Sequence, residues 1–131
     1  MDGTLYLDDR LFDGVTDFLA RIRERGGRYL FLTNNSSRGV ESYMEKLDGM
    51  GIRTERRDYL TSVDAAIDCL RRRYPGKRCY VQGTRSFYDQ LAAAGIPVTC
   101  DREDGADILL SGFDRELTFR KLEDACILLE R

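Results

Sequence analysis

Apolar residues recur along this chain at a spacing typical of helices. Four segments carry apolar side chains at positions i, i+3, i+4 and i+7, which puts those side chains on one face of an α-helix. The four segments are residues 15–22, 40–47, 63–70 and 122–129. A fifth helix is predicted over residues 86–94, because Tyr88, Leu91 and Ala92 share a face and Gly95 follows as a stop. The pattern predicts five helices that each bury one face.

Short apolar runs lie between these segments. RYLFLT (28–33), CYVQ (79–82) and DILLS (107–111) are nearly continuous in apolar residues, which predicts strands buried on both faces. Residues 5–14 alternate and end in Asp13-Gly14, which suits a small hairpin. Strands that alternate with helices indicate parallel crossovers, so the predicted fold class is α/β.

The charge balance narrows the range of partners. The formal net charge is −2, so the chain has no overall excess of positive charge that would attract a nucleic acid or an anionic membrane. The arginines between residues 53 and 57 are interpreted as a solvated surface with no function. No apolar run is long enough to span a bilayer, and the N-terminus is acidic. We therefore expect a cytoplasmic protein with no nucleic-acid or membrane partner.

Two polar loops carry the candidate chemistry. Residues 33–37, TNNSS, follow the predicted strand 28–33, at the strand end where α/β sheets bind ligands. A hydroxyl and main-chain amides before a helix can hold a phosphate. Alternatively, Ser36 or Ser37 simply caps the next helix. Residues 2–4, Asp-Gly-Thr, are by themselves common turn residues. Histidine is absent, so any catalysis must use carboxylates, hydroxyls, lysines and amides.

The two loops together resemble a known family. MDGTLY (1–6) and LTNNSS (32–37) are similar to the first two motifs of the haloacid dehalogenase superfamily, most closely its subfamily IIA branch of phosphoglycolate, 4-nitrophenyl phosphate and nucleotide monophosphate phosphatases. The likeness continues through DYLTS (58–62), YVQGT (80–84) and residues 112–126. It implies part of a Rossmann-like core over residues 1–60, followed by the first part of an α/β cap of the C2 type over residues 61–131.

The resemblance also implies roles for individual residues. It indicates a Mg²⁺-dependent phosphatase that forms an aspartyl-phosphate intermediate and acts on a small phosphorylated metabolite. Asp2 matches the general acid/base, and its main-chain carbonyl would face the metal. Gly3, Thr33 and Asn34 match phosphate-binding positions, and Asn35 would orient the loop or the substrate.

Several family positions have no match. The nucleophilic aspartate belongs two positions before Asp2, and the family's first strand, later lysine and acidic magnesium loop are also unmatched. Lys121 does not replace the later lysine, because its neighbours match the cap. We therefore expect a fragment truncated at both ends and inactive alone. Strand 28–33 would lack its parallel neighbour, which predicts marginal stability or self-association as a homo-oligomer.

Two other functions remain open. If Met1 is the authentic start, the chain is a non-catalytic phosphate-binding or regulatory α/β module that lacks the nucleophile. A dinucleotide-binding domain is disfavoured, because no G-x-G-x-x-G follows any predicted strand.

Overall fold

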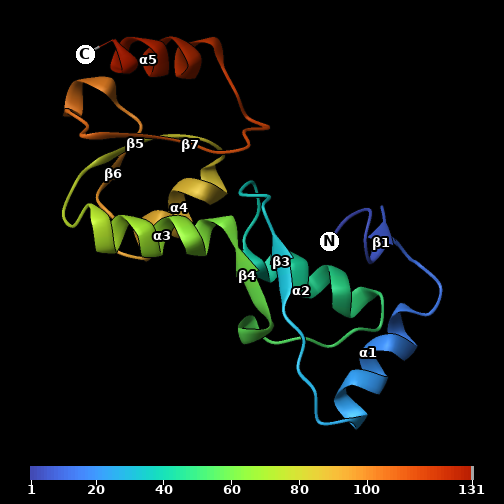
Figure 1. Cartoon of the computed structure of the whole chain (residues 1–131). Helices are drawn as coiled ribbons and strands as arrows, with labels where there is room; N and C mark the ends of the chain where they lie inside the picture. The colour runs from blue at the N-terminus through green and yellow to red at the C-terminus, as the bar shows by residue number, and fades with distance from the viewer. Residues whose placement is uncertain (131) are drawn as a thin grey trace. The chain divides into compact units, whose positions relative to one another are not determined.

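The computed structural model describes residues 1–130, and these residues form two compact units (Figure 1). The first unit contains residues 1–33 and 40–61, and the second contains residues 34–39 and those from 62 onward. These ranges differ from the expected 1–60 and 61–131 at residue 61, which falls in the first unit, and at residues 34–39, which hydrogen-bond within the second unit. The assignment of the two parts to a core and a cap stays a prediction.

The first unit combines two helices with two small sheets. Its elements are β1 (Tyr6–Leu7), β2 (Arg10–Leu11), α1 (Val15–Glu24), β3 (Phe31–Thr33), α2 (Val40–Gly49), the 3₁₀ turn η1 (Arg56–Asp58) and β4 (Tyr59–Thr61). Strands β3 and β4 are parallel, with Phe31 opposite Tyr59 and their ring centroids 5.3 Å apart. Both rings are buried in one core with Leu47 of α2 and Leu19 of α1. The predicted helices 15–22 and 40–47 are confirmed.

The predicted hairpin over residues 5–14 is confirmed, but its turn was misplaced. Strands β1 and β2 are antiparallel, with Tyr6 opposite Leu11, so the turn falls at residues 8 and 9. Asp8 adopts a positive φ of 52°, which a tight hairpin turn requires and which aspartate tolerates. Gly14 does not close the hairpin; it is the N-cap of α1, with a φ of 81°.

Strand β3 does have a parallel neighbour, so the expectation that it would lack one is wrong. Strand β4 was missed because its three residues are too few to show a period and follow a charged stretch. The expectation that β3 is buried on both faces is also wrong for the described residues. Leu30, Leu32 and Leu60 are 51%, 61% and 44% exposed. Because parallel strands are usually covered on both faces, self-association through this surface stays a prediction.

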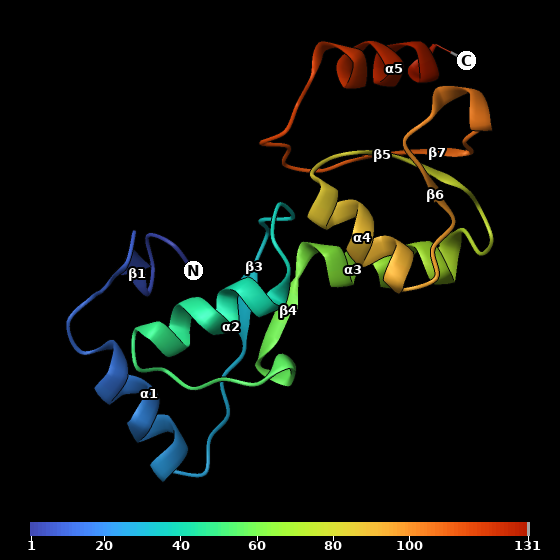
Figure 2. The ribbon, with the colours of Figure 1, turned by 180° about the vertical axis from the view of Figure 1, so that it is seen from behind.

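The second unit is a three-layer α/β arrangement. Its elements are α3 (Ser62–Arg73), β5 (Cys79–Gln82), α4 (Arg85–Ala93), β6 (Val98–Thr99), the 3₁₀ turn η2 (Arg102–Asp104), β7 (Ile108–Ser111) and α5 (Phe119–Leu129). The strands are parallel in the order β6-β5-β7. Helices α3 and α4 lie on one face of this sheet and α5 lies on the other, as the two opposite views show (Figure 1, Figure 2). The predicted α/β class is therefore confirmed, as are the helices and strands predicted in this unit.

Alternation along β5 divides its side chains between these two layers. Cys79 and Val81 are buried in the cluster that contains Phe87 and Leu91 of α4. Tyr80 points the other way, and its hydroxyl donates a hydrogen bond to Asp124 of α5 at 3.3 Å. No helix within residues 1–130 is long and apolar enough to cross a membrane.

Candidate functional site

The Asp2-Gly3 segment forms a tight turn. The Gly3 amide donates to Oδ1 of Asp2 at 3.0 Å and to the carbonyl of Tyr6 at 2.8 Å, and the amides of Thr4 and Leu5 both donate to the carbonyl of Met1. Gly3 has a φ of 71°, which explains why a glycine stands there. Asp2 is exposed, so its carboxyl group is accessible to solvent.

The second loop begins where β3 ends. Thr33 is half-buried and lies opposite Thr61 in the parallel pair. Asn34 is exposed, and its carbonyl accepts a hydrogen bond from Ser62 Oγ at 3.1 Å. The structure thus places Thr33 at the carboxyl end of a parallel strand, as predicted from the sequence.

Asn35 and the two serines hold the loop in shape. Oδ1 of Asn35 accepts hydrogen bonds from the amide and the hydroxyl of Ser37, at 2.9 and 2.7 Å. Ser36 Oγ accepts from the amide of Phe113 at 2.9 Å. Helix α2 begins only at Val40, so the expectation that these serines cap it is wrong. Their hydroxyls instead fix residues 34–39 within the second unit, and Asn35 orients the loop through Ser37.

Thr84 ties the same loop to the start of α4. Its hydroxyl accepts from the Phe87 amide at 3.2 Å, which makes it the N-cap of α4, and donates to the Ser37 carbonyl at 3.2 Å. Gly112 approaches the loop from the end of β7. An added Cβ at Gly112 would lie 2.7 Å from Ser36 Oγ and 2.8 Å from Cε1 of Phe87. Gly112 is therefore needed for close packing.

Replacing Gly112 with alanine destabilises the second unit by about 1–3 kcal/mol, because the new methyl group overpacks Ser36 and Phe87. The matched control is Gly49→Ala, since a Cβ at Gly49 meets nothing within 4 Å and the residue ends α2. Urea unfolding of both variants checks this. Equal unfolding free energies for the two variants would show that the close approach at Gly112 carries no cost.

Lys121 connects the loop after β5 to the loop after β7 by hydrogen bonds. Its ammonium group donates to the carbonyls of Gly83 and Glu116, at 2.9 and 3.1 Å, and to Oδ2 of Asp114 at 3.1 Å. The Asp114 side chain is only 2% exposed. An ammonium group has three donors, and these partners use all of them. That Lys121 does not replace the family's later lysine stays a prediction.

The structure brings together some of the predicted site residues. Asp2 and Gly3 share one turn, and they belong to the first unit together with Thr33. Asn34 and Asn35 group with the second unit. The predicted roles of these residues in acid/base chemistry and phosphate binding stay predictions.

The donor set for a metal ion is incomplete within the described part of the chain. Mg²⁺ is usually bound through one or two carboxylates, with waters and substrate oxygens. Asp2 offers one carboxylate and a main-chain carbonyl. Among residues 1–130, no group of three or more histidine, cysteine, aspartate or glutamate side chains could hold a metal ion. These residues therefore do not form a magnesium site on their own.

Two long-range contacts of this region could not be predicted from local sequence patterns. Ser36 contacts Phe113, which lies 77 positions further along the chain, and Lys121 contacts Gly83 across 38 positions. Neither pairing has a local pattern, so only the folded chain reveals them. Gly83 and Gly112 could have been recognised from the sequence as positions where the backbone approaches a neighbouring group closely.

Comparison with known proteins identifies the family. A model of haloacid dehalogenase-like hydrolases matches residues 1–97. The chain belongs to this family of haloacid dehalogenase-like hydrolases, and its relatives agree with the subfamily IIA branch. It is 30% identical over 127 residues to an acid sugar phosphatase of Staphylococcus aureus (strain USA300), which covers 97% of this chain and 48% of that protein. An acid sugar phosphatase of Staphylococcus saprophyticus is 28% identical, with the same shares covered. The chain spans about half the length of these relatives.

Solved structures of similar proteins agree in fold. A 4-nitrophenylphosphatase from Thermotoga maritima superposes with a TM-score of 0.90 at 37% identity, over 98% of this chain and 48% of that chain. A glycerol phosphate phosphatase from Mycobacterium tuberculosis, in complex with magnesium, superposes with a TM-score of 0.88 at 27% identity, over 98% of this chain and 39% of that chain. The relatives named here are all phosphatases.

Proposed function

We propose that the protein containing these residues is a phosphomonoester hydrolase that works through an aspartyl-phosphate intermediate on a small phosphorylated metabolite. The observation that carries the proposal is the exposed Asp2 carboxyl group in the Gly3 turn, in a chain of a phosphatase-containing family. Thr33 is the last residue of β3 and Asn34 follows it. They supply a hydroxyl and an amide of the kind that binds phosphoryl oxygens.

In the proposed reaction, a carboxylate oxygen of an aspartate two positions before Asp2 attacks phosphorus, and the ester P–O bond breaks. Asp2 gives its proton to the departing alkoxide. A water molecule then attacks the acyl phosphate, and Asp2 takes a proton from that water as inorganic phosphate leaves. Thr33 and the Asn34 amide donate to the oxygens that gain charge.

Magnesium is proposed as the cofactor of the whole protein. When bound, Mg²⁺ neutralises charge on the phosphoryl oxygens. Of the described residues, Asp2 would contribute its main-chain carbonyl. The structure of the glycerol phosphate phosphatase relative, in complex with magnesium, supports this assignment by family resemblance.

The test compares two polypeptides with 4-nitrophenyl phosphate and a panel of sugar and glycerol phosphates. One polypeptide is the 131 residues alone, and the other is the protein read in frame from the native gene. We expect no turnover by the first, because it has no aspartate two positions before Asp2. We expect turnover by the second, lost with a chelator and restored by Mg²⁺. Phosphate binding without turnover in both would favour the non-catalytic module.

A further inference from the structure

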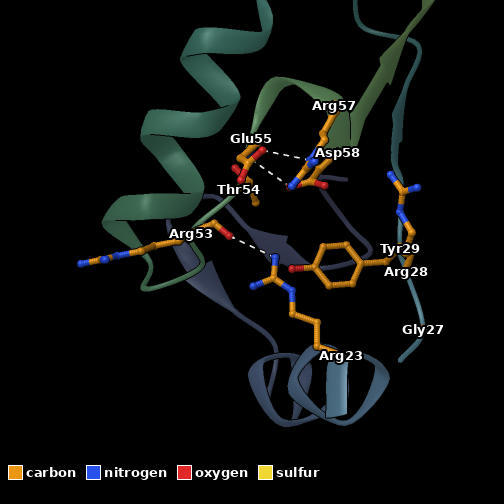
Figure 3. Close-up of a pocket in the computed structure, with 9 residues that line it drawn as sticks. All are labelled: Arg23, Gly27, Arg28, Tyr29, Arg53, Thr54, Glu55, Arg57 and Asp58. Atoms are coloured by element: carbon orange, nitrogen blue, oxygen red, sulfur yellow. Dashed lines mark hydrogen bonds and ion pairs between the residues drawn. The ribbon is translucent and has the colours of Figure 1, made fainter. Parts of the chain in front are cut away.

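A pocket of about 440 Å³ lies in the first unit (Figure 3). Its lining includes residues 27–29, which precede β3, whereas Thr33 ends that strand. The end of α1, the segment before β3 and the segment between α2 and β4 form its walls. The volume falls within the range of small-molecule sites, roughly 300–1,000 Å³. Four of its nine lining residues are arginines, against one glutamate and one aspartate. The pocket is therefore net positive in a chain whose net charge is −2.

Arg23 is held in place at the floor of this pocket. Its guanidinium group stacks on the Tyr29 ring, 4.8 Å from the centroid, and donates to the Arg53 carbonyl at 3.4 Å. The Arg53 side chain itself turns away from the pocket (Figure 3). Arg28 also lines the pocket, and its exposed side chain extends along the segment before β3 (Figure 3). Arg23 is thus positioned before any ligand arrives, which lowers the entropy cost of binding.

The acidic residues of the lining are already engaged. Glu55 pairs with Arg57 at 2.9 Å, and Oδ2 of Asp58 accepts from the Glu55 amide at 2.8 Å. None of the ion pairs found among residues 1–130 includes Arg23 or Arg28. Two guanidinium groups therefore remain available to an anion.

Tyr29 adds a neutral donor between these charges. Burial raises the pKa of Tyr29 above its usual 10.0, against a smaller opposing effect from Arg23. The hydroxyl therefore stays protonated at neutral pH and can donate a hydrogen bond to an oxygen.

We propose that this pocket binds a small phosphate-bearing anion, with Arg23 and Arg28 on the phosphate oxygens and Tyr29 as an additional donor. Guanidinium groups match phosphate in geometry and charge. This site is separate from the loop at Thr33 and goes beyond the proposed hydrolysis. The proposed binding thus rests on Arg23 and Arg28 and not on the arginines between residues 53 and 57.

Isothermal titration of the whole protein with inorganic pyrophosphate and AMP tests the proposal, at a fixed ionic strength near 0.15 M and with adenosine as the uncharged probe. The protein carries Thr33→Val, so that binding at the proposed active site is weakened and does not mask the pocket. Arg23→Gln and Arg28→Gln are each expected to weaken phosphate binding about tenfold or more. The control variants are Arg21→Gln on the same helix and Arg73→Gln in the second unit, both exposed and outside the pocket.

Saturable binding of AMP or pyrophosphate that survives Thr33→Val and is weakened by Arg28→Gln, but not by the controls, supports the proposal. Arg28→Gln is the decisive variant, because removing the Arg23 side chain also loses its ring contact. Absence of phosphate binding in the Thr33→Val protein would overturn the proposal. So would equal weakening by Arg21→Gln, or adenosine binding as tight as AMP binding. These readouts do not depend on whether the protein hydrolyses phosphomonoesters.

Discussion

Replacing Asp2 with asparagine in the whole protein is expected to lower kcat for the proposed phosphomonoester hydrolysis by about 10²–10⁴-fold. Asparagine keeps the side-chain oxygen that accepts from the Gly3 amide at 3.0 Å, so the turn remains formed. It cannot give a proton to the leaving group or take one from water. Steady-state kinetics with 4-nitrophenyl phosphate measures the effect, which should fall on kcat much more than on KM.

The matched control for this prediction is Asp8→Asn. Asp8 is an exposed aspartate in the adjacent hairpin, and its positive φ of 52° suits asparagine equally well. It should retain wild-type kcat, and both variants should unfold at the wild-type temperature. If Asp2→Asn retains kcat within a factor of two of the control, Asp2 is not the general acid/base.

Replacing Asp124 with alanine destabilises the second unit by roughly 3 kcal/mol. The side chain is 7% exposed, pairs with Nη1 of Arg102 at 3.0 Å and accepts from the hydroxyl of Tyr80 at 3.3 Å. Tyr80 is 1% exposed, so its hydroxyl would lose a partner in a place that water does not readily reach. Burial, with Asp124 nearby, raises the pKa of Tyr80 to about 12.

Urea unfolding of Asp124→Ala measures this loss. Asp89→Ala is the control, because Asp89 is exposed on α4 and pairs with Arg85 at 2.9 Å across one helical turn. Exposed pairs of this kind contribute less than about 1 kcal/mol. A loss for Asp124→Ala no larger than that of the control would show that the buried network does not hold α5 to the sheet.

The sequence predicted well those elements whose apolar spacing repeats several times. All five helices appear, because each repeats its apolar spacing over two turns or more. Strand β5 also matches expectation, since its continuous apolar run is covered on both faces. The short strands β4 and β6 were missed, because two or three residues show no period. Strand β3 covers only Phe31–Thr33 of the predicted strand 28–33, and Leu32 is exposed where the sequence predicted burial on both faces.

The candidate site was predictable only as a set of motifs. The family resemblance pointed to Asp2 and Thr33, and the structure places Thr33 at the end of a parallel strand. The role of Ser36 was not predictable, because its partner Phe113 is distant in sequence and a serine before a helix usually suggests a cap. The arginine pocket was not predictable either, because Arg23 and Arg53 come from separate parts of the chain and meet only through a carbonyl.

The most direct test of the phosphatase assignment is to trap the covalent intermediate. The whole protein is mixed with 4-nitrophenyl phosphate, quenched in acid within one turnover and digested for mass spectrometry. We expect one added phosphoryl group on an aspartate two positions before Asp2, and more of it in the Asp2→Asn variant than in the Asp8→Asn control, since Asp2 is proposed to assist its hydrolysis. Turnover with no phosphorylated aspartate, or with the phosphoryl group on Thr33 or Ser36, would contradict the proposed mechanism.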